Sequence, residues 1–320
     1  MDPRETTIRG QVLLAIFLLL IGLIALVRAG PLFVDGAVQL ARSLNMSSVV
    51  IGAIVLGFGT SAPELVVSTI AASQGDPALG VGNIVGSNVA NLSLVLGVAA
   101  LVTPIALTSS VTRRQAPLSI AAVIIFALLV WTGGELTRGE GAILLVLLVA
   151  AMVVLIKSPA DNVVPLQGPQ QTLGRSLLLS LLGLGGVLIG AQLTVSGATR
   201  LADEWGLSGG FIGFSIVALG TSLPELVTAV AAARKKEAGL IVGNLFGSNL
   251  FNGLAGGAAI GLVGAGSIAD ARLTGGGLIA MVGAVAFAYL QGARKQRIGK
   301  PDALLLLAIY VAAMLWLGIG

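Results

Sequence analysis

Two glutamates lie inside long apolar segments, where a buried carboxylate costs free energy. Glu64 is the only charged residue between Val49 and Ala72, a stretch long enough to cross a bilayer. Glu225 holds the matching place in a second apolar stretch. An ionised side chain at that depth costs at least about 2.5 kcal/mol on the mildest scale. The pair therefore indicates a functional site inside a membrane.

Further oxygen-bearing residues recur around each glutamate. GTSAPELV at 59–66 returns as GTSLPELV at 220–227, and VGNIVGSNVAN at 81–91 returns as VGNLFGSNLFN at 242–252. Residues four apart share one helix face, as the serine and the last asparagine of each second motif do. The candidate ligands are Glu64, Glu225, Thr60, Ser61, Thr221, Ser222, Ser87, Asn91, Ser248 and Asn252. Carboxylate, hydroxyl and amide oxygens suit Ca²⁺, which takes 6–8 oxygen ligands, and also Na⁺.

The composition restricts both the class of protein and the chemistry. The 320 residues are 56% hydrophobic and 10% charged, with a mean hydropathy of +1.01, so we expect a polytopic membrane protein. Cys and His are absent, which excludes disulfides, thiol chemistry and imidazole metal ligands. No cofactor motif occurs, and the net charge of +4 is no argument for nucleic acid, because loop cations in a membrane protein report orientation.

Ten apolar runs predict ten membrane spans, near residues 10–29, 49–72, 78–101, 116–132, 140–157, 175–197, 211–233, 239–263, 273–291 and 303–319. The Pro- and Gln-rich stretch 158–174 predicts a linker between a first five-helix repeat, 1–157, and a second, 175–320. The first run also resembles a signal peptide, but a retained helix is favoured. The predicted fold class is all-α.

The chain repeats itself in inverted orientation. Residues 33–92 align without a gap on 194–253 at a constant offset of 161, with 25 of 60 positions identical. Five predicted spans separate equivalent points, and an odd number means that the second copy crosses the membrane in the opposite sense. Inverted repeats are typical of secondary transporters, whose substrate site lies near the midplane between the repeats.

Proline interrupts both glutamate-bearing spans. Pro63 and Pro224 lack an N–H and clash with the carbonyl four residues back, so we expect breaks between Gly57 and Thr60 and around 218–221. Irregular backbone at membrane depth is tolerated only where it is buried in protein or lines a cavity. The freed carbonyls at the end of a half-helix favour cations.

Several residues also have a purely structural interpretation. A single buried glutamate often holds helices together as a hydrogen-bonded group, although a repeated pair makes this less favoured. The glycines of G82-x-x-x-G86 and G243-x-x-x-G247 are more typical of packing faces than of ligands. Four further asparagines are equally compatible with helix capping and with the site: Asn83, Asn88, Asn244 and Asn249.

Basic residues predict the orientation. Thirteen of the 18 Lys and Arg lie in the loops after odd-numbered spans, and five lie on the other side. The positive-inside rule places the thirteen in the cytoplasm and both termini outside, in the plasma or bacterial inner membrane.

The paired motifs GTSxPE and GNxxGSNxxN, given twice in inverted copies, resemble the sodium/calcium exchanger family of the cation/calcium antiporter superfamily, in its short prokaryotic form. The resemblance covers the whole chain. It implies ten helices in two inverted repeats, with spans 2, 3, 7 and 8 forming the ion-binding core and spans 1 and 6 sliding across it. It also implies that the ten residues above are ligands, joined by the backbone carbonyls of Gly57 and Ala218.

One position departs from the family pattern, because many members carry Asp where this chain has Asn252. The expected function is still a Na⁺/Ca²⁺ antiporter, with a predicted 3:1 electrogenic stoichiometry. An H⁺/Ca²⁺ antiporter using the same glutamates is the alternative; a passive channel and an enzyme are less favoured. The expected partners are Ca²⁺, Na⁺ and lipid, with no cofactor, nucleic acid or obligatory protein partner.

Overall fold

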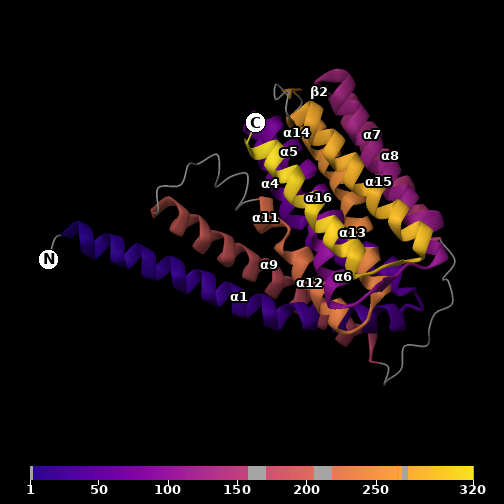
Figure 1. The fold of residues 1–320 in the computed structure, drawn as a ribbon, viewed down its shortest axis with the longest axis horizontal. Coiled ribbons are helices and arrows are strands. Elements are labelled where there is room, and N and C mark those ends of the chain that lie inside the picture. The colour runs from indigo at the N-terminus through magenta and orange to yellow at the C-terminus, as the bar shows by residue number, and fades with distance from the viewer. Residues whose placement is uncertain (1–2, 158–170, 205–217, 265, 269–272, 320) are drawn as a thin grey trace.

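The computed structural model describes residues 3–157, 171–204, 218–264, 266–268 and 273–319. Figure 1 shows a bundle of helices and, beside it, two long helices that run together away from the bundle, with the N-terminus at their far end. These two are α1, Pro3–Ser43, and α9, Leu173–Glu204. At 1.5 Å per residue, the 41 residues of α1 extend about 62 Å, twice the thickness of a bilayer core.

The rest of the first half is a sequence of helices with short interruptions. In chain order its elements are α2 (Ser48–Ile51), the π-helix η1 (Gly52–Gly57), α3 (Phe58–Thr60), α4 (Ala62–Ser73), α5 (Pro77–Ala90), η2 (Asn91–Val95), α6 (Leu96–Val102), β1 (Ile105–Ala106), η3 (Val111–Gln115), α7 (Ala116–Gly133), β2 (Glu135–Leu136) and α8 (Arg138–Ile156).

The second half follows α9 with the same succession: α11 (Ala218–Thr221), α12 (Leu223–Arg234), α13 (Ala238–Phe251), η5 (Asn252–Gly256), α14 (Gly257–Gly264), β3 (Gly266–Ser267), η6 (Leu273–Gly277), α15 (Leu278–Lys295), β4 (Arg297–Ile298) and α16 (Lys300–Ile319). The bounds of α5 and η2 reappear in α13 and η5 after 161 residues, and those of η3 and α7 reappear in η6 and α15 after 162. The repeat in sequence is therefore a repeat in structure.

Two short antiparallel strand pairs join the halves. β1 pairs with β4 through Ile105 and Ile298, and β2 pairs with β3 through Glu135 and Ser267. By the repeat, β1 corresponds to β3 and β2 to β4, so the two pairs are equivalent and each takes one strand from each half. The all-α expectation missed these strands, because two-residue segments leave no hydrophobic period to read.

The predicted spans are recovered only in part. Within the described residues, six helices are long and apolar enough to cross a membrane, and one bent pair makes a seventh, so the count of ten is not reached by this criterion. The first helix continues beyond its apolar run at 10–29, through Pro31, to Ser43. Residues 211–217 of the predicted seventh span and 158–170 of the predicted linker lie outside the described residues, and α9 already begins at Leu173.

The break in each glutamate-bearing helix lies later than predicted. Ser61 leaves the helical conformation with φ −83° and ψ 4°, and Ser222 does the same with φ −86° and ψ 2°. The segments before them, predicted to be broken, are helical. Pro63 and Pro224 sit in the first turn of the next helix, where a missing N–H costs nothing, so the irregular residue falls just before that turn. In the helix that carries Glu64, the segments Ser48–Thr60 and Ala62–Ser73 are bent by 44° relative to each other.

Small residues bring the backbones of the core helices together. A Cβ added at Gly243 would lie 2.3 Å from the carbonyl oxygen of Val49, and one added at Gly247 would lie 2.6 Å from the Cα of Ala53. The G243-x-x-x-G247 motif is therefore a packing face, as predicted. The contact fixes α13 against η1, and these two elements carry site residues of opposite halves.

α1 and α9 are packed equally closely. A Cβ at Gly36 would approach the backbone nitrogen of Ser180 to 2.4 Å, and one at Gly183 would approach that of Phe33 to 2.4 Å. Close backbone contact over several turns makes the two helices one unit. The bundle touches this unit mainly through α12, which contacts α1.

Candidate cation-binding site

All ten side chains predicted as ligands are buried. Glu64 is 1% exposed and Glu225 is 0% exposed, and the hydroxyl and amide residues range from 0% to 8%. They come from the ends of α3, α11, α5 and α13 and from the helix starts that follow. The bends at Ser61 and Ser222 and the close contact of α13 with η1 bring the motifs of the two halves to one place.

Glu225 accepts hydrogen bonds from both halves. Its Oε1 atom takes the hydroxyl of Ser61 at 3.1 Å and the hydroxyl of Ser248 at 3.3 Å. Ser61 belongs to the first GTSxPE motif, so the acid of one repeat is held by the motif of the other. This cross-connection shows that the two motif copies form one site.

Glu64 accepts a hydrogen bond from its own half, as Glu225 does from Ser248. Its Oε1 atom accepts the hydroxyl of Ser87 at 3.3 Å. In each carboxylate the second oxygen, Oε2, is buried and accepts no hydrogen bond from the described residues. A pair of buried acceptor atoms without donors suits a cation far better than a helix contact.

The threonines face amides rather than carboxylates. Thr60 Oγ1 donates to the Leu56 carbonyl at 2.8 Å and lies 3.2 Å from Asn244 Oδ1, and Thr221 Oγ1 lies 3.4 Å from Asn83 Oδ1. Both hydroxyl oxygens are buried among the predicted site residues. The sequence does not show which asparagine each threonine contacts, because Asn83 and Asn244 occupy the same position in two copies of one motif.

Asn83 and Asn244 support the site from behind. Asn83 Nδ2 donates to the backbone carbonyl of Glu64 and to Ser68 Oγ, both at 3.1 Å, and Asn244 Nδ2 donates to Thr228 Oγ1 at 3.2 Å. Asn83 therefore orients the residue that carries the acid. Ser68 and Thr228 were not predicted, and only their place on the same helix face as the glutamates points to them.

The asparagines of the second motif form a chain between the halves. Asn91 Nδ2 donates to Asn249 Oδ1 at 3.1 Å, and Asn249 Nδ2 donates to the Asn88 carbonyl at 3.1 Å. The Oδ1 atom of Asn91 is buried without a donor, so it stays available to a cation. Asn88 donates to Met281 Sδ at 3.4 Å. All three asparagines therefore have structural bonds, and the Oδ1 atom of Asn88, like that of Asn91, accepts no hydrogen bond from the described residues.

Asn252 lies beside Ser61. Both line a small pocket whose remaining walls are Phe58, Leu65, Phe251, Ala255 and Gly256. The rings of Phe58 and Phe251 stand 5.2 Å apart at this pocket. The Nδ2 atom of Asn252 is buried and donates to no described acceptor. An amide nitrogen cannot bind a cation, so Asn252 contributes at most its oxygen, and the site keeps two formal negative charges.

The two predicted carbonyl ligands are those of Gly57 and Ala218. The carbonyl of Gly57 accepts the N–H of Ser61 and the hydroxyl of Ser248, each at 3.2 Å. It is therefore not freed by the helix break, although it points to the site. Ala218 is the first residue of α11, and its side chain lies outside the described residues.

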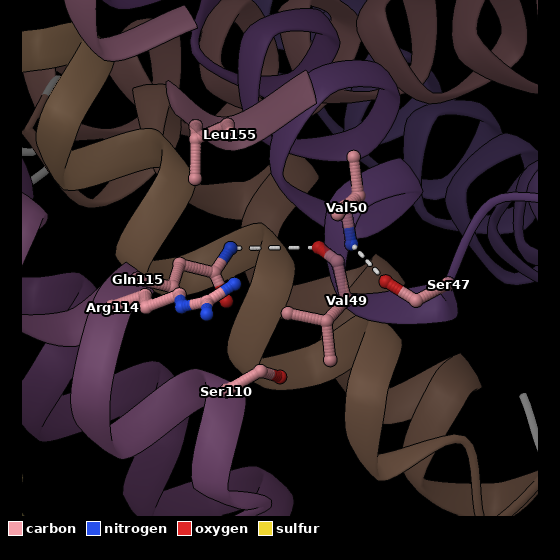
Figure 2. A pocket seen from close by; sticks show the side chains of 7 residues that line it. All are labelled: Ser47, Val49, Val50, Ser110, Arg114, Gln115 and Leu155. Carbon is pink, nitrogen blue, oxygen red and sulfur yellow. Dashed lines mark hydrogen bonds between the residues drawn. The ribbon is translucent and has the colours of Figure 1, made fainter. Parts of the chain in front are cut away.

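Gln115 is a further buried polar residue that sequence reasoning missed. Its Nε2 atom lies 3.4 Å from the Val49 carbonyl and 3.5 Å from the Gly243 carbonyl, at the point where α2 and α13 touch. Figure 2 shows the bond to Val49, in a pocket that Arg114 and Ser47 also line. The equivalent position in the second half is Gly277, so the repeat gives no signal for Gln115.

The arrangement is a candidate cation site that offers hard oxygen ligands. Within the described part of the chain, no group of three or more His, Cys, Asp or Glu could hold a metal ion. The two buried carboxylates are accompanied here by neutral oxygens of Ser, Thr, Asn and the backbone. Such a set binds Ca²⁺ in flexible geometry, releases it more easily than an all-carboxylate cage, and also suits Na⁺.

Known proteins share both the sequence and the fold. The chain matches the family described as sodium/calcium exchanger protein over residues 14–157 and 175–318. CaxA of Alkalimonas amylolytica is 36% identical over 312 residues, which are 93% of this chain and 97% of CaxA. The sodium/calcium exchanger MaX1 of Methanosarcina acetivorans is 29% identical over 277 residues, which are 73% of this chain and 79% of MaX1.

A solved structure of the sodium-calcium exchanger NCX_Mj, soaked with Na⁺ and Sr²⁺, superposes with a TM-score of 0.84 at 32% identity. The match covers 95% of this chain and 98% of that one. Fold, repeat and sequence agree over nearly the whole length. The chain belongs to the sodium/calcium exchanger family and is an integral membrane antiporter built from two inverted repeats.

Proposed function

We propose that this protein exchanges Na⁺ for Ca²⁺ by alternating access, with Glu64 and Glu225 as the shared acidic ligands. The observation that carries the proposal is the pair of buried carboxylates, each with one oxygen bonded to serine and the other without a donor among the described residues, with Glu225 bonded across the halves to Ser61. Ca²⁺ neutralises both charges at once. Na⁺ ions replace it at the same oxygens, and this competition couples the two fluxes.

The surrounding oxygens favour Na⁺ over H⁺ as the counter-ion. A proton needs only the carboxylate, whereas this site adds the hydroxyls of Ser61, Ser87 and Ser248 and the amide oxygen of Asn91. An unloaded pair of buried charges is costly, so the carrier reorients mainly when loaded. The closely packed α1–α9 unit is the element that we propose to slide across the core, giving ten spans in two five-helix repeats, 1–157 and 175–320.

Flux measurements test the counter-ion directly. Purified protein in lipid vesicles loaded with Na⁺ should take up Ca²⁺ from a Na⁺-free medium, and vesicles loaded with K⁺ or held at an acidic interior pH should not. The reason is that only Na⁺ satisfies the neutral oxygens of the site. Uptake driven by an outward proton gradient alone would identify an H⁺/Ca²⁺ antiporter instead. Protein-free vesicles with each gradient are the control.

We propose further that the protein lies in the plasma or inner membrane with both termini outside. The support is the excess of basic residues in the loops after odd-numbered spans. A reporter inserted between Arg234 and Glu237 should be cytoplasmic, and one fused after Gly320 should be outside. Compartment-specific activity of the two fusions measures this. Reporters on the same side would show that the number of spans between them is even.

A further inference from the structure

The last third of α1 carries an ion pair to the core. Lys235 Nζ bonds Asp35 Oδ1, and the two side chains are 33% and 55% exposed. Asp35 lies within α1, eight residues before its end at Ser43, and Lys235 follows α12 directly. Residues 235–237, which join α12 to α13 and are here named the 235–237 turn, are therefore attached to α1 by charge.

A second pair of opposite charges lies at the same contact. Glu237 caps α13, and Arg42 stands in the last turn of α1. Partial burial raises the pKa of Glu237, while the positive charges of Arg42 and Lys235 act on it in the opposite direction. The pattern is crossed: α1 offers an acid and a base, and the 235–237 turn offers a base and an acid.

The repeat has no equivalent of this contact. At the offset of 161 residues, Asp35 corresponds to Ser196 and Lys235 to Gln74, which are both neutral. Arg42 corresponds to Asp203 and Glu237 to Asp76, which are both acids. The two attractive pairs of one half therefore become a neutral pair and a like-charge pair in the other.

An apolar contact lies next to the charges. A Cβ added at Gly30 of α1 would lie 2.5 Å from Val227 Cγ1 of α12. Ala231, one turn further on the same face of α12, is 5% exposed. α1 therefore packs against this face of α12, and Ala231 lies one turn from the contact at Val227.

We propose that Asp35, Arg42, Lys235 and Glu237 form an electrostatic latch that stabilises one of the two access states over the other. This rests on the proposed alternating access. In an inverted-repeat carrier the two states exchange the roles of the repeats. The contact of α1 with the 235–237 turn is then replaced by the contact of α9 with residues 74–76, which lacks the attractive pairs. The latch makes the equilibrium between the states unequal.

Cysteine labelling tests the latch without any transport assay. The chain has no cysteine, so Ala231→Cys provides a single buried thiol one turn from the contact of α12 with α1. In nanodiscs, Lys235→Glu should raise the rate of maleimide labelling by about threefold to tenfold, because attraction to Asp35 becomes repulsion. Restoring the pair with reversed signs, in Asp35→Lys with Lys235→Glu, should bring the rate back. Arg113→Glu is the matched control, an exposed charge reversal on η3, and should leave the rate unchanged.

Salt provides a second measurement that needs no reversed charge. Raising N-methyl-D-glucamine chloride from about 20 to 500 mM should speed the labelling of Ala231→Cys, because exposed ion pairs are screened. The same titration should have little effect once Asp35→Asn and Arg42→Gln are added. A Lys235→Glu rate equal to the parent's, or a salt response that survives in the neutral variant, would overturn the latch. Since labelling needs no counter-ion, a failure of Na⁺/Ca²⁺ exchange leaves this result intact.

Discussion

Replacing either Glu64 or Glu225 by Gln should reduce Ca²⁺ transport at least a hundredfold while the protein still folds. Gln keeps the Oε1 acceptor that Ser87 or Ser61 binds, so the neutral contacts survive and only the charge is lost. A unit charge pair 4 Å apart contributes about 4 kcal/mol at an effective dielectric constant of 20, which is nearly a thousandfold. Initial rates of Na⁺-dependent ⁴⁵Ca²⁺ uptake measure the loss.

The matched control is Glu135→Gln, which removes an exposed carboxylate on β2. It should transport at the parent's rate. Thermal stability in detergent should be unchanged or higher in the two site variants, because removing a buried charge lowers the cost of burial. Near-normal flux in either site variant would show that its glutamate is not a ligand.

The second expected result is electrical: exchange should carry one net charge per cycle. With a tenfold inward Na⁺ gradient and about −100 mV inside, each Na⁺ that enters releases about 3.7 kcal/mol, of which 2.3 comes from the potential. Expelling Ca²⁺ against a 10⁴-fold gradient costs about 10.1 kcal/mol. Two Na⁺ release too little, and three release about 11.1 kcal/mol, so we expect a 3:1 stoichiometry.

Vesicles loaded with Na⁺ report the sign of that charge. Each cycle exports three positive charges and imports two, so an interior-positive potential should favour Ca²⁺ uptake. For one net charge, a change of 100 mV is worth about 2.3 kcal/mol, which shifts the equilibrium Ca²⁺ ratio about 50-fold. The potential is set with K⁺ and valinomycin, and omitting valinomycin is the control. A Ca²⁺ ratio indifferent to the potential would mean electroneutral 2:1 exchange, with the asparagine at position 252 as the first residue to change to Asp.

The sequence predicts the centre of this molecule better than its connections. The two glutamates, their serines and the repeat are visible because motifs recur at one offset, and burial of all ten side chains agrees with that reading. The predicted break lies before the observed one at Ser61. A proline alone does not fix how many preceding residues leave the helix, and here the first turn of the next helix accommodates Pro63.

Contacts between distant segments were not visible in sequence. Thr60 meets Asn244 across 184 positions, and Lys235 meets Asp35 across 200. Neither pair follows from local propensity, because the chain holds many other amides and charged side chains that could pair equally well with this hydroxyl or this charge. Gln115 was missed for a related reason, since its contacts depend on one close approach of α2 to α13 and have no counterpart in the repeat.

The two strand pairs affect the order in which the molecule is assembled. β1 is made 193 residues before its partner at Ile298, and β2 is made 132 residues before its partner at Ser267. Neither pair can close while only the first half has left the ribosome. The first half must therefore remain in the lipid with open strand edges until translation is nearly complete, and assembly of the two halves is a late, long-range step of biogenesis.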